Sequence, residues 1–154
     1  MSENIAFTFL LDQQPSEIFN AINNVRGWWS ESLEGESEKQ DNEFIYRYKD
    51  LHYSKQRLIE VMPYKKVVWL VTDSHLSFTK KSDEWTGTQI VFTITQEGDQ
   101  TRLHFEHIGL TPAVECFDAC TGGWSHYLKQ SLIPLIITGK GQPALRLTEP
   151  AIDK

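Results

Sequence analysis

The feature that most constrains this chain is its last long apolar segment, residues 111–141. Thr111-Pro112 is a helix-start signal, because a hydroxyl can cap a helix and proline suits its first turn. Gly139 predicts a left-handed cap at the other end, with Lys140 beside the negative end of the helix dipole. The apolar residues recur every three or four positions, at Val114, Phe117, Cys120, Trp124, Leu128, Leu132 and Leu135. They predict one buried stripe on a helix roughly 40 Å long, the only element long enough to organise a core.

Two features interrupt the helical pattern of this segment. Each glycine of Gly122-Gly123 costs about 1 kcal/mol relative to alanine, so we expect a break there, between a short helix over residues 112–120 and the main helix. The alternative is that the glycines allow close approach of a ligand or strand at a pocket mouth. Pro134 removes a helix hydrogen bond and clashes with the carbonyl of Gln130. It predicts a kink that wraps the helix around a curved sheet, with a role in shaping a pocket as the alternative.

The size and charge of the chain limit its possible functions. Its 154 residues indicate one domain with a real hydrophobic core. A net charge of −6 and a sequence pI of about 5.3 argue against nucleic acid or an anionic membrane as the partner, because phosphate binding needs a basic surface. No apolar run approaches the length of a membrane-spanning helix, and the acidic N-terminus lacks the pattern of a signal peptide. We therefore expect no membrane span and a cytoplasmic location.

The two cysteines, Cys116 and Cys120, lie four residues apart on the predicted helix. They share a helix face but are poorly placed for a disulfide, so we interpret them as small core residues. A metal site that adds His126 is the alternative, although no second pair of ligands is near in the sequence. We expect no metal and no cofactor.

Before this helix, apolar and polar residues alternate in short runs bounded by turn signals, which is typical of strands. The first strand is predicted over residues 5–11, followed by a proline-led helix over 15–23 and a helical turn over 25–30. The acidic segment after them predicts a solvated connection or a weak edge strand near residues 32–35. The remaining strands are predicted at residues 43–49, 51–62, 66–73, 88–96 and 101–108, with an extension past residue 73 as an alternative.

The order of these elements predicts the fold. Consecutive strands joined by short loops pair antiparallel, and a sheet of this size twists and curls. We predict an α+β fold: a curved antiparallel sheet of six to seven strands wraps around the long C-terminal helix, with two short helices after the first strand. A single domain over residues 1–141 and a loosely held extension over residues 142–154 complete this prediction.

Short motifs follow one another along the chain in a specific order. They are PSEIFNA at residues 15–21, Trp28-Trp29, EVMP at 60–63, VVW at 67–69, FEHIGL at 105–110, Gly123-Trp124, Ser131-Leu132 and GKG at 139–141. Together they resemble the START or birch-pollen-allergen superfamily (SRPBCC), and within it the bacterial branch similar to activators of the heat-shock-protein-90 ATPase. The likeness covers roughly residues 5–141, and Pro134 departs from it.

The resemblance implies a helix-grip fold with a deep cavity between the sheet and the long helix. In several members that cavity binds hydrophobic or amphipathic small molecules, and some relatives act as cyclases or dehydratases. The chaperone activator proper also carries a separate N-terminal chaperone-binding domain, for which this chain has no room.

The candidate pocket residues are aromatic residues at strand spacing and members of the helix stripe. They are Trp28, Tyr46, Tyr48, Trp69, Phe92, Phe105, His107, Phe117, Cys120, Trp124, Leu128 and Leu132. Plain core packing is the alternative for the aromatic members. His107 in an apolar cavity is a candidate acid or base, with a core histidine bonded to backbone or a tyrosine hydroxyl as the alternative. Glu60 is its candidate partner if it lies on the concave side, and otherwise it faces solvent.

We predict a binding protein for a hydrophobic or amphipathic small molecule, held between sheet and helix. The alternatives are a chaperone-linked interaction or stress-response module, and a polyketide cyclase- or dehydratase-like enzyme that uses His107. The sequence contains no nucleophile elbow, phosphate loop, HExxH motif or CxxC pair, so His107 and Glu60 are the only catalytic candidates. We expect a monomer or a homodimer.

Overall fold

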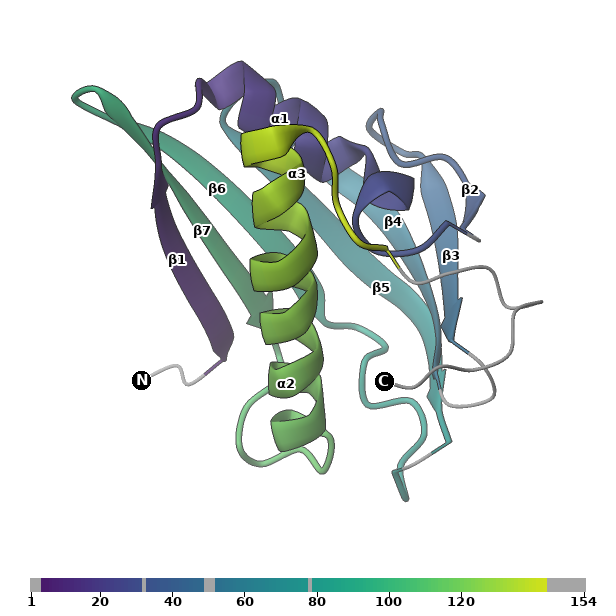
Figure 1. The fold of residues 1–154 in the computed structure, drawn as a ribbon. Helices are drawn as coiled ribbons and strands as arrows, with labels where there is room; N and C mark the ends of the chain where they lie inside the picture. Colours follow the sequence, from purple (N-terminus) through teal and green to yellow (C-terminus); the bar gives the residue numbers. More distant parts are fainter. Residues whose placement is uncertain (1–3, 32, 49–51, 78, 144–154) are drawn as a thin grey trace.

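A seven-stranded antiparallel sheet, in the order β1-β7-β6-β5-β4-β3-β2, forms the body of the molecule (Figure 1). The computed structural model describes residues 4–31, 33–48, 52–77 and 79–143. The strands are β1 (Ile5–Leu11), β2 (Glu34–Gly35), β3 (Glu43–Tyr48), β4 (His52–Met62), β5 (Lys66–Leu76), β6 (Gln89–Glu97) and β7 (Gln100–Ile108). Each strand pairs with its successor except β1, which pairs with the last strand, β7. The predicted α+β helix-grip fold is confirmed.

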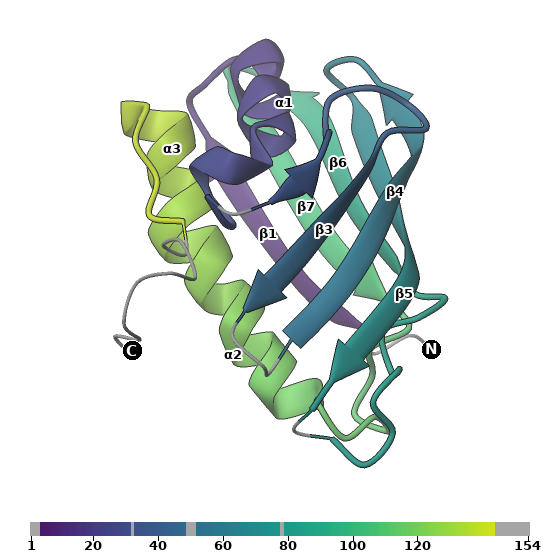
Figure 2. The same cartoon turned by 90° about the vertical axis from the view of Figure 1, so that its right-hand side faces the viewer.

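Three consecutive helical segments cross the concave face of this sheet. They are α2 (Phe117–Tyr127), a π-helical turn (Leu128–Leu132) and α3 (Ile133–Thr138). Figure 2 shows the sheet bent around this composite helix, with α1 (Pro15–Asn23) beside α3. Register shifts at Lys55/Gln56 and Leu58/Glu60 mark bulges in β4, which bend a strand and increase its twist. The helix and the curved sheet therefore enclose a common interior.

The local predictions agree closely with the structure at the N-terminal half. The first strand and the helix Pro15–Asn23 have the predicted bounds, and the helical turn is a short 3-10 helix, Val25–Gly27. The weak edge strand is β2, and β5 extends to Leu76, beyond the predicted end at residue 73. Most of the extension predicted for residues 142–154 lies outside the described residues.

The predicted helix start at Thr111-Pro112 is wrong, because the helix begins at Phe117. The preceding residues form turns, and the Glu84 carboxylate accepts hydrogen bonds from the backbone N–H groups of Glu115 (2.8 Å) and Cys116 (3.0 Å). A carboxylate at this place satisfies free donors at the helix N-terminus and complements its positive end. The cap therefore comes from a distant loop.

The predicted break at Gly122-Gly123 is also wrong, since α2 continues through both glycines. The interruption is instead the π-helical turn just before α3, where Pro134 lies in the first turn. Side chains spaced by four drift by about 40° per step on an ideal helix, and a wider π turn offsets that drift. Ile136 accordingly takes the buried place predicted for Leu135, which is only half-buried.

The helix glycines give a prediction on stability. A Cβ added at Gly122 meets nothing within 4 Å, so Gly122→Ala should raise the free energy of unfolding by about 1 kcal/mol, the helix-propensity difference. Gly109→Ala is the contrast, because Gly109 has φ +110° and its Cβ would lie 2.7 Å from Thr88 Cγ2. We expect a loss of about 2 kcal/mol or more there. Urea denaturation measures both, and stabilisation by Gly109→Ala would contradict this account.

Candidate functional site

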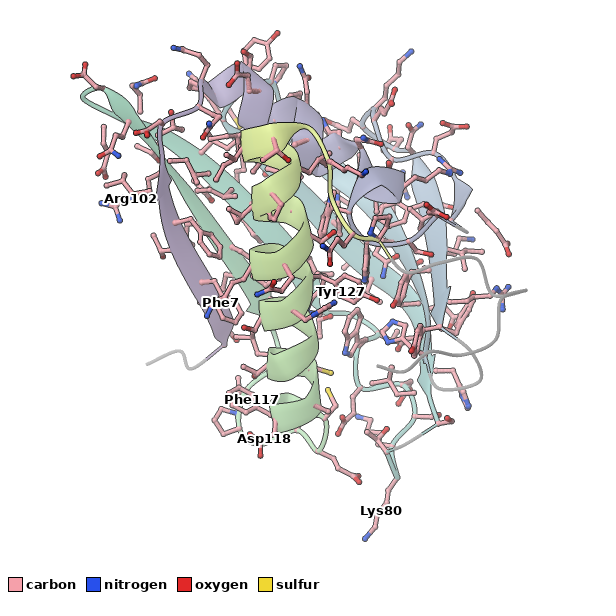
Figure 3. All side chains as sticks on the ribbon, in the orientation of Figure 1. Phe7, Lys80, Arg102, Phe117, Asp118 and Tyr127 are labelled. Atoms are coloured by element: carbon pink, nitrogen blue, oxygen red, sulfur yellow. The ribbon has the colours of Figure 1, made fainter. Side chains whose placement is uncertain are left out.

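An apolar pocket of about 270 Å³ lies between α2 and the ends of β3 and β4. Its lining residues are Trp29, Tyr46, Tyr48, His52, Trp85, Ala119, Cys120, Gly123, Trp124 and Tyr127. The space exists because small residues, Ala119, Cys120 and Gly123, follow one another on adjoining turns of α2. In Figure 3 the Tyr127 side chain leaves the helix on the side of β3 and β4, whereas Phe117 lies at the start of α2. The pocket is therefore a gap in the helix stripe, walled by aromatic rings.

Indole rings build the inner wall of this pocket. Trp29 stacks on Tyr46 with ring centres 4.2 Å apart and planes 14° apart. The Trp85 and Trp124 rings are also nearly parallel, with ring centres 5.9 Å apart and an angle of 13° between their planes. All three indoles are at most 3% exposed, so the packing around them holds their orientation. Such flat, rigid apolar surfaces suit a planar ligand.

His107 holds the Trp124 indole by a hydrogen bond and packs edge-on against the Trp85 indole, with ring centres 4.7 Å apart. The Trp124 indole N–H donates to His107 Nδ1 (3.0 Å), and the Thr88 hydroxyl donates to the Trp85 carbonyl (2.6 Å). The His107 Nε2–H therefore donates to Thr88 Oγ1 (2.8 Å), which makes Nε2 the protonated nitrogen. Both ring nitrogens are occupied and the side chain is fully buried. This places His107 in the core, bonded to a tryptophan and a threonine, with no nitrogen free for a substrate.

Glu60 does not join His107. Its side chain is 42% exposed and lies 3.6 Å from the Lys66 ammonium on the solvent side. The two catalytic candidates are thus not brought together, and the enzyme alternative loses the acid–base pair on which it rested.

The polar groups that do line the pocket are neutral. His52 Nε2 lies 2.8 Å from Ser54 Oγ, and burial lowers the pKa of His52 to about 3. The Tyr46 and Tyr127 hydroxyls are 3.1 Å apart, and burial raises the pKa of both phenols. At neutral pH these groups offer hydrogen bonds without charge.

The sequence predictions located part of this site. Of the predicted pocket residues, Tyr46, Tyr48, Cys120 and Trp124 line it. The others lie outside its lining: His107 and Phe117 as described above, and Trp28, Trp69, Phe92, Phe105, Leu128 and Leu132 in the packed core. For these core residues the alternative of plain core packing applies. The centre of the Phe92 ring lies 5.0 Å from the Trp69 ring centre and 5.3 Å from the Phe105 ring centre.

Sequence reasoning missed the other lining residues, among them Trp29, Trp85 and His52. Three polar residues at alternate positions of one predicted strand, His52, Ser54 and Gln56, were the available signal, because they share one strand face. Within the described ranges, no group of three His, Cys, Asp or Glu side chains could hold a metal ion. No helix in the described part of the chain is long and apolar enough to cross a membrane.

Comparison with known proteins agrees with this architecture. The family model described as Activator of Hsp90 ATPase homolog 1-like protein matches residues 12–133. The Aha1 dimer from Colwellia psychrerythraea superposes with a TM-score of 0.72 at 20% identity, covering 91% of this chain and 100% of that one. Mll3558 from Rhizobium loti superposes with a TM-score of 0.68 at 14% identity. The match covers 88% of this chain and 96% of Mll3558. DynU16, from the dynemicin biosynthetic locus, superposes with a TM-score of 0.67 at 14% identity. The match covers 95% of this chain and 52% of DynU16.

At sequence identities of 20% and 14%, the structural likeness shows only that these proteins share a fold with this chain. Among curated proteins, no sequence matches this chain.

The buried histidine predicts how stability depends on pH. Burial, with a smaller effect of His52, lowers the pKa of His107 from 6.5 to about 3. The unfolded chain therefore takes up a proton below pH 6.5 that the folded chain refuses until about pH 3. Stability from this group is complete above pH 6.5 and falls by up to about 1.4 kcal/mol per pH unit below it.

Urea titrations between pH 6 and pH 4 test this expectation. In the His107→Gln variant the unfolding free energy should fall less steeply with decreasing pH, by the contribution of roughly one proton, about 1.4 kcal/mol per pH unit. An equal slope in the wild type and the His107 variant would contradict a neutral, buried imidazole.

Proposed function

The chain belongs to the family of Activator of Hsp90 ATPase homolog 1-like proteins, and on this premise we propose that it binds a small, neutral molecule with a planar apolar body. The observation that carries the proposal is the pocket between α2 and the ends of β3 and β4, with its stacked aromatic wall. Its volume of about 270 Å³ lies near the lower limit of small-molecule sites, about 300–1,000 Å³. A ligand of two fused rings matches that space.

The chemistry of the lining supports a neutral ligand. No Lys, Arg, Asp or Glu is among the lining residues, so a buried ion would lose its hydration without a counter-charge. The Tyr46 and Tyr127 hydroxyls and the His52 ring can exchange hydrogen bonds with a hydroxyl or carbonyl on the ligand. The expected ligand is therefore amphipathic: an apolar ring system with one or two uncharged polar groups.

Two glycines on adjacent positions of α2 allow a matched test. Gly123 lines the pocket and Gly122 does not, and a Cβ at either meets nothing within 4 Å. We expect 2-naphthol, a neutral planar probe, to bind the wild type in calorimetric titration. Gly123→Leu should weaken that binding at least tenfold, because its side chain fills the pocket, while Gly122→Leu should change it less than twofold.

The charged analogue 2-naphthoate provides the control for polarity. It should bind at least tenfold more weakly than 2-naphthol, because the lining offers no cation. Equal affinity of the Gly123→Leu and Gly122→Leu variants for 2-naphthol would refute the proposed site, as would tighter binding of 2-naphthoate than of 2-naphthol by the wild type.

A second candidate function is contact with an Hsp90-type chaperone, the partner in the family description. A specific surface favours it: the turn between β4 and β5 exposes Met62 (43%) and Tyr64 (51%) beside Lys65. Tyr64 has φ +68°, which costs a non-glycine residue about 1–2 kcal/mol and marks an unusual backbone position. An exposed aromatic ring held at such a cost suits a protein partner. The cytoplasmic location and the choice between monomer and homodimer stay predictions.

Tyr64→Gly tests this candidate while keeping the turn, since glycine accepts a positive φ. We expect the wild type to change the ATPase rate of a purified Hsp90, and the variant to need at least three times the concentration for the same effect. Leu10→Ala, equally exposed at 51% but on β1, is the control. No effect of the wild-type chain, or an equal effect of all three proteins, would remove this candidate.

A further inference from the structure

The structure brings the two cysteine sulfurs close together. Cys116 Sγ and Cys120 Sγ are 2.7 Å apart, although the sequence spacing predicted a poor placement for a disulfide. Cys116 is the residue just before α2, with φ −79° and ψ 0°, so it is not confined to the helical side-chain direction. A disulfide bond is about 2.05 Å long, so the sulfurs need to approach by less than about 1 Å.

The two thiols differ in access. Cys120 lines the ligand pocket and is 7% exposed, whereas Cys116 is 1% exposed and does not line the pocket. A reagent that enters the pocket therefore meets the Cys120 sulfur first, and Cys116 stands next to it as a second thiol. The pocket serves here as a route, whether or not it also holds a ligand.

The hydrogen bonds around the two cysteines also differ. The Trp85 indole N–H donates to Cys120 Sγ (3.3 Å), which favours a thiolate there. The hydrogen bond with Cys116 lowers the pKa of the Cys120 thiol, against the opposing effect of burial. The hydrogen bond with Cys120, followed by burial, raises the pKa of Cys116. A thiol with a lowered pKa beside a thiol with a raised pKa is the arrangement of an attacking and a resolving cysteine.

We propose that Cys116 and Cys120 form a reversible redox site that reacts with an organic hydroperoxide entering through the aromatic pocket. The Cys120 sulfur attacks the terminal peroxide oxygen, the O–O bond breaks, and the alcohol leaves with the proton. Cys120 is thereby oxidised to a sulfenic acid and the peroxide is reduced. The Cys116 sulfur then attacks the Cys120 sulfur, and the sulfenic oxygen leaves as water with the thiol proton. An external dithiol restores both thiols by exchange and becomes a disulfide itself.

Thiol counting on the wild-type protein tests the site directly. The reduced chain is treated with one equivalent of cumene hydroperoxide, then unfolded and alkylated with N-ethylmaleimide. We expect loss of both alkylation sites, a mass lower by two hydrogen atoms, and recovery of both sites with dithiothreitol. Two thiols that remain fully alkylated, or a disulfide that joins two chains, would overturn the proposal.

Single variants test the two roles. Cys116→Ser should stop at a sulfenic acid that dimedone traps on Cys120, and Cys120→Ser should stay unmodified under the same conditions. Trapping on Cys116, or equal trapping in both variants, would overturn the assignment.

Gly123→Leu tests the route. It should slow oxidation by cumene hydroperoxide at least tenfold more than oxidation by hydrogen peroxide, and equal slowing would refute entry through the pocket. Thiol counting needs no ligand affinity, so its outcome is independent of the 2-naphthol titration.

Discussion

The chain of buried hydrogen bonds from Trp124 through His107 and Thr88 to Trp85 ties the long helix to the sheet. It joins α2, β7 and the loop before β6, three parts that are distant in the sequence. Each group in the chain is satisfied only while all the others stay in place, and an unsatisfied buried group costs about 1–3 kcal/mol. This network therefore helps to fix the position of the helix over the sheet, and with it the shape of the space between them.

Aromatic packing and the hydrogen-bond network support each other. The five tryptophans are all buried, and Trp28 and Trp29 contact Trp69 and Trp124 in one continuous cluster. Rings of this size leave gaps where small residues face them, as Ala119 and Gly123 do. The pocket is therefore a consequence of pairing the largest side chains with the smallest.

The sequence predicted best those elements whose signals are local. Pro15 opens α1 and Gly139 closes α3 with φ +87°, and both signals act on their own neighbours. The start of α2 was misplaced because its cap is the carboxylate of Glu84, on a loop that no local pattern links to the helix.

The pocket was only partly predictable for a similar reason. Periodicity identifies buried faces, but it does not show where large side chains on one element meet small ones on another. Trp85 lies in a loop without periodicity, and a search for apolar strand faces passes over His52, because the neighbours on its face, Ser54 and Gln56, are polar.

The composite helix has two ends of different character. From Leu128 onward it presents Leu128, Leu132 and Ile136 to a filled interior beside α1, whereas α2 lines the pocket with the small residues Ala119, Cys120 and Gly123, next to the large ring of Trp124. The interior is filled at the C-terminal end of the helix, and the pocket lies at its N-terminal end. Substitutions at positions 119, 120 and 123 can consequently change which ligand the pocket accommodates, while Trp124 and the packed residues from Leu128 onward keep the helix in place on the sheet. Homologues with the same fold need not bind the same ligand.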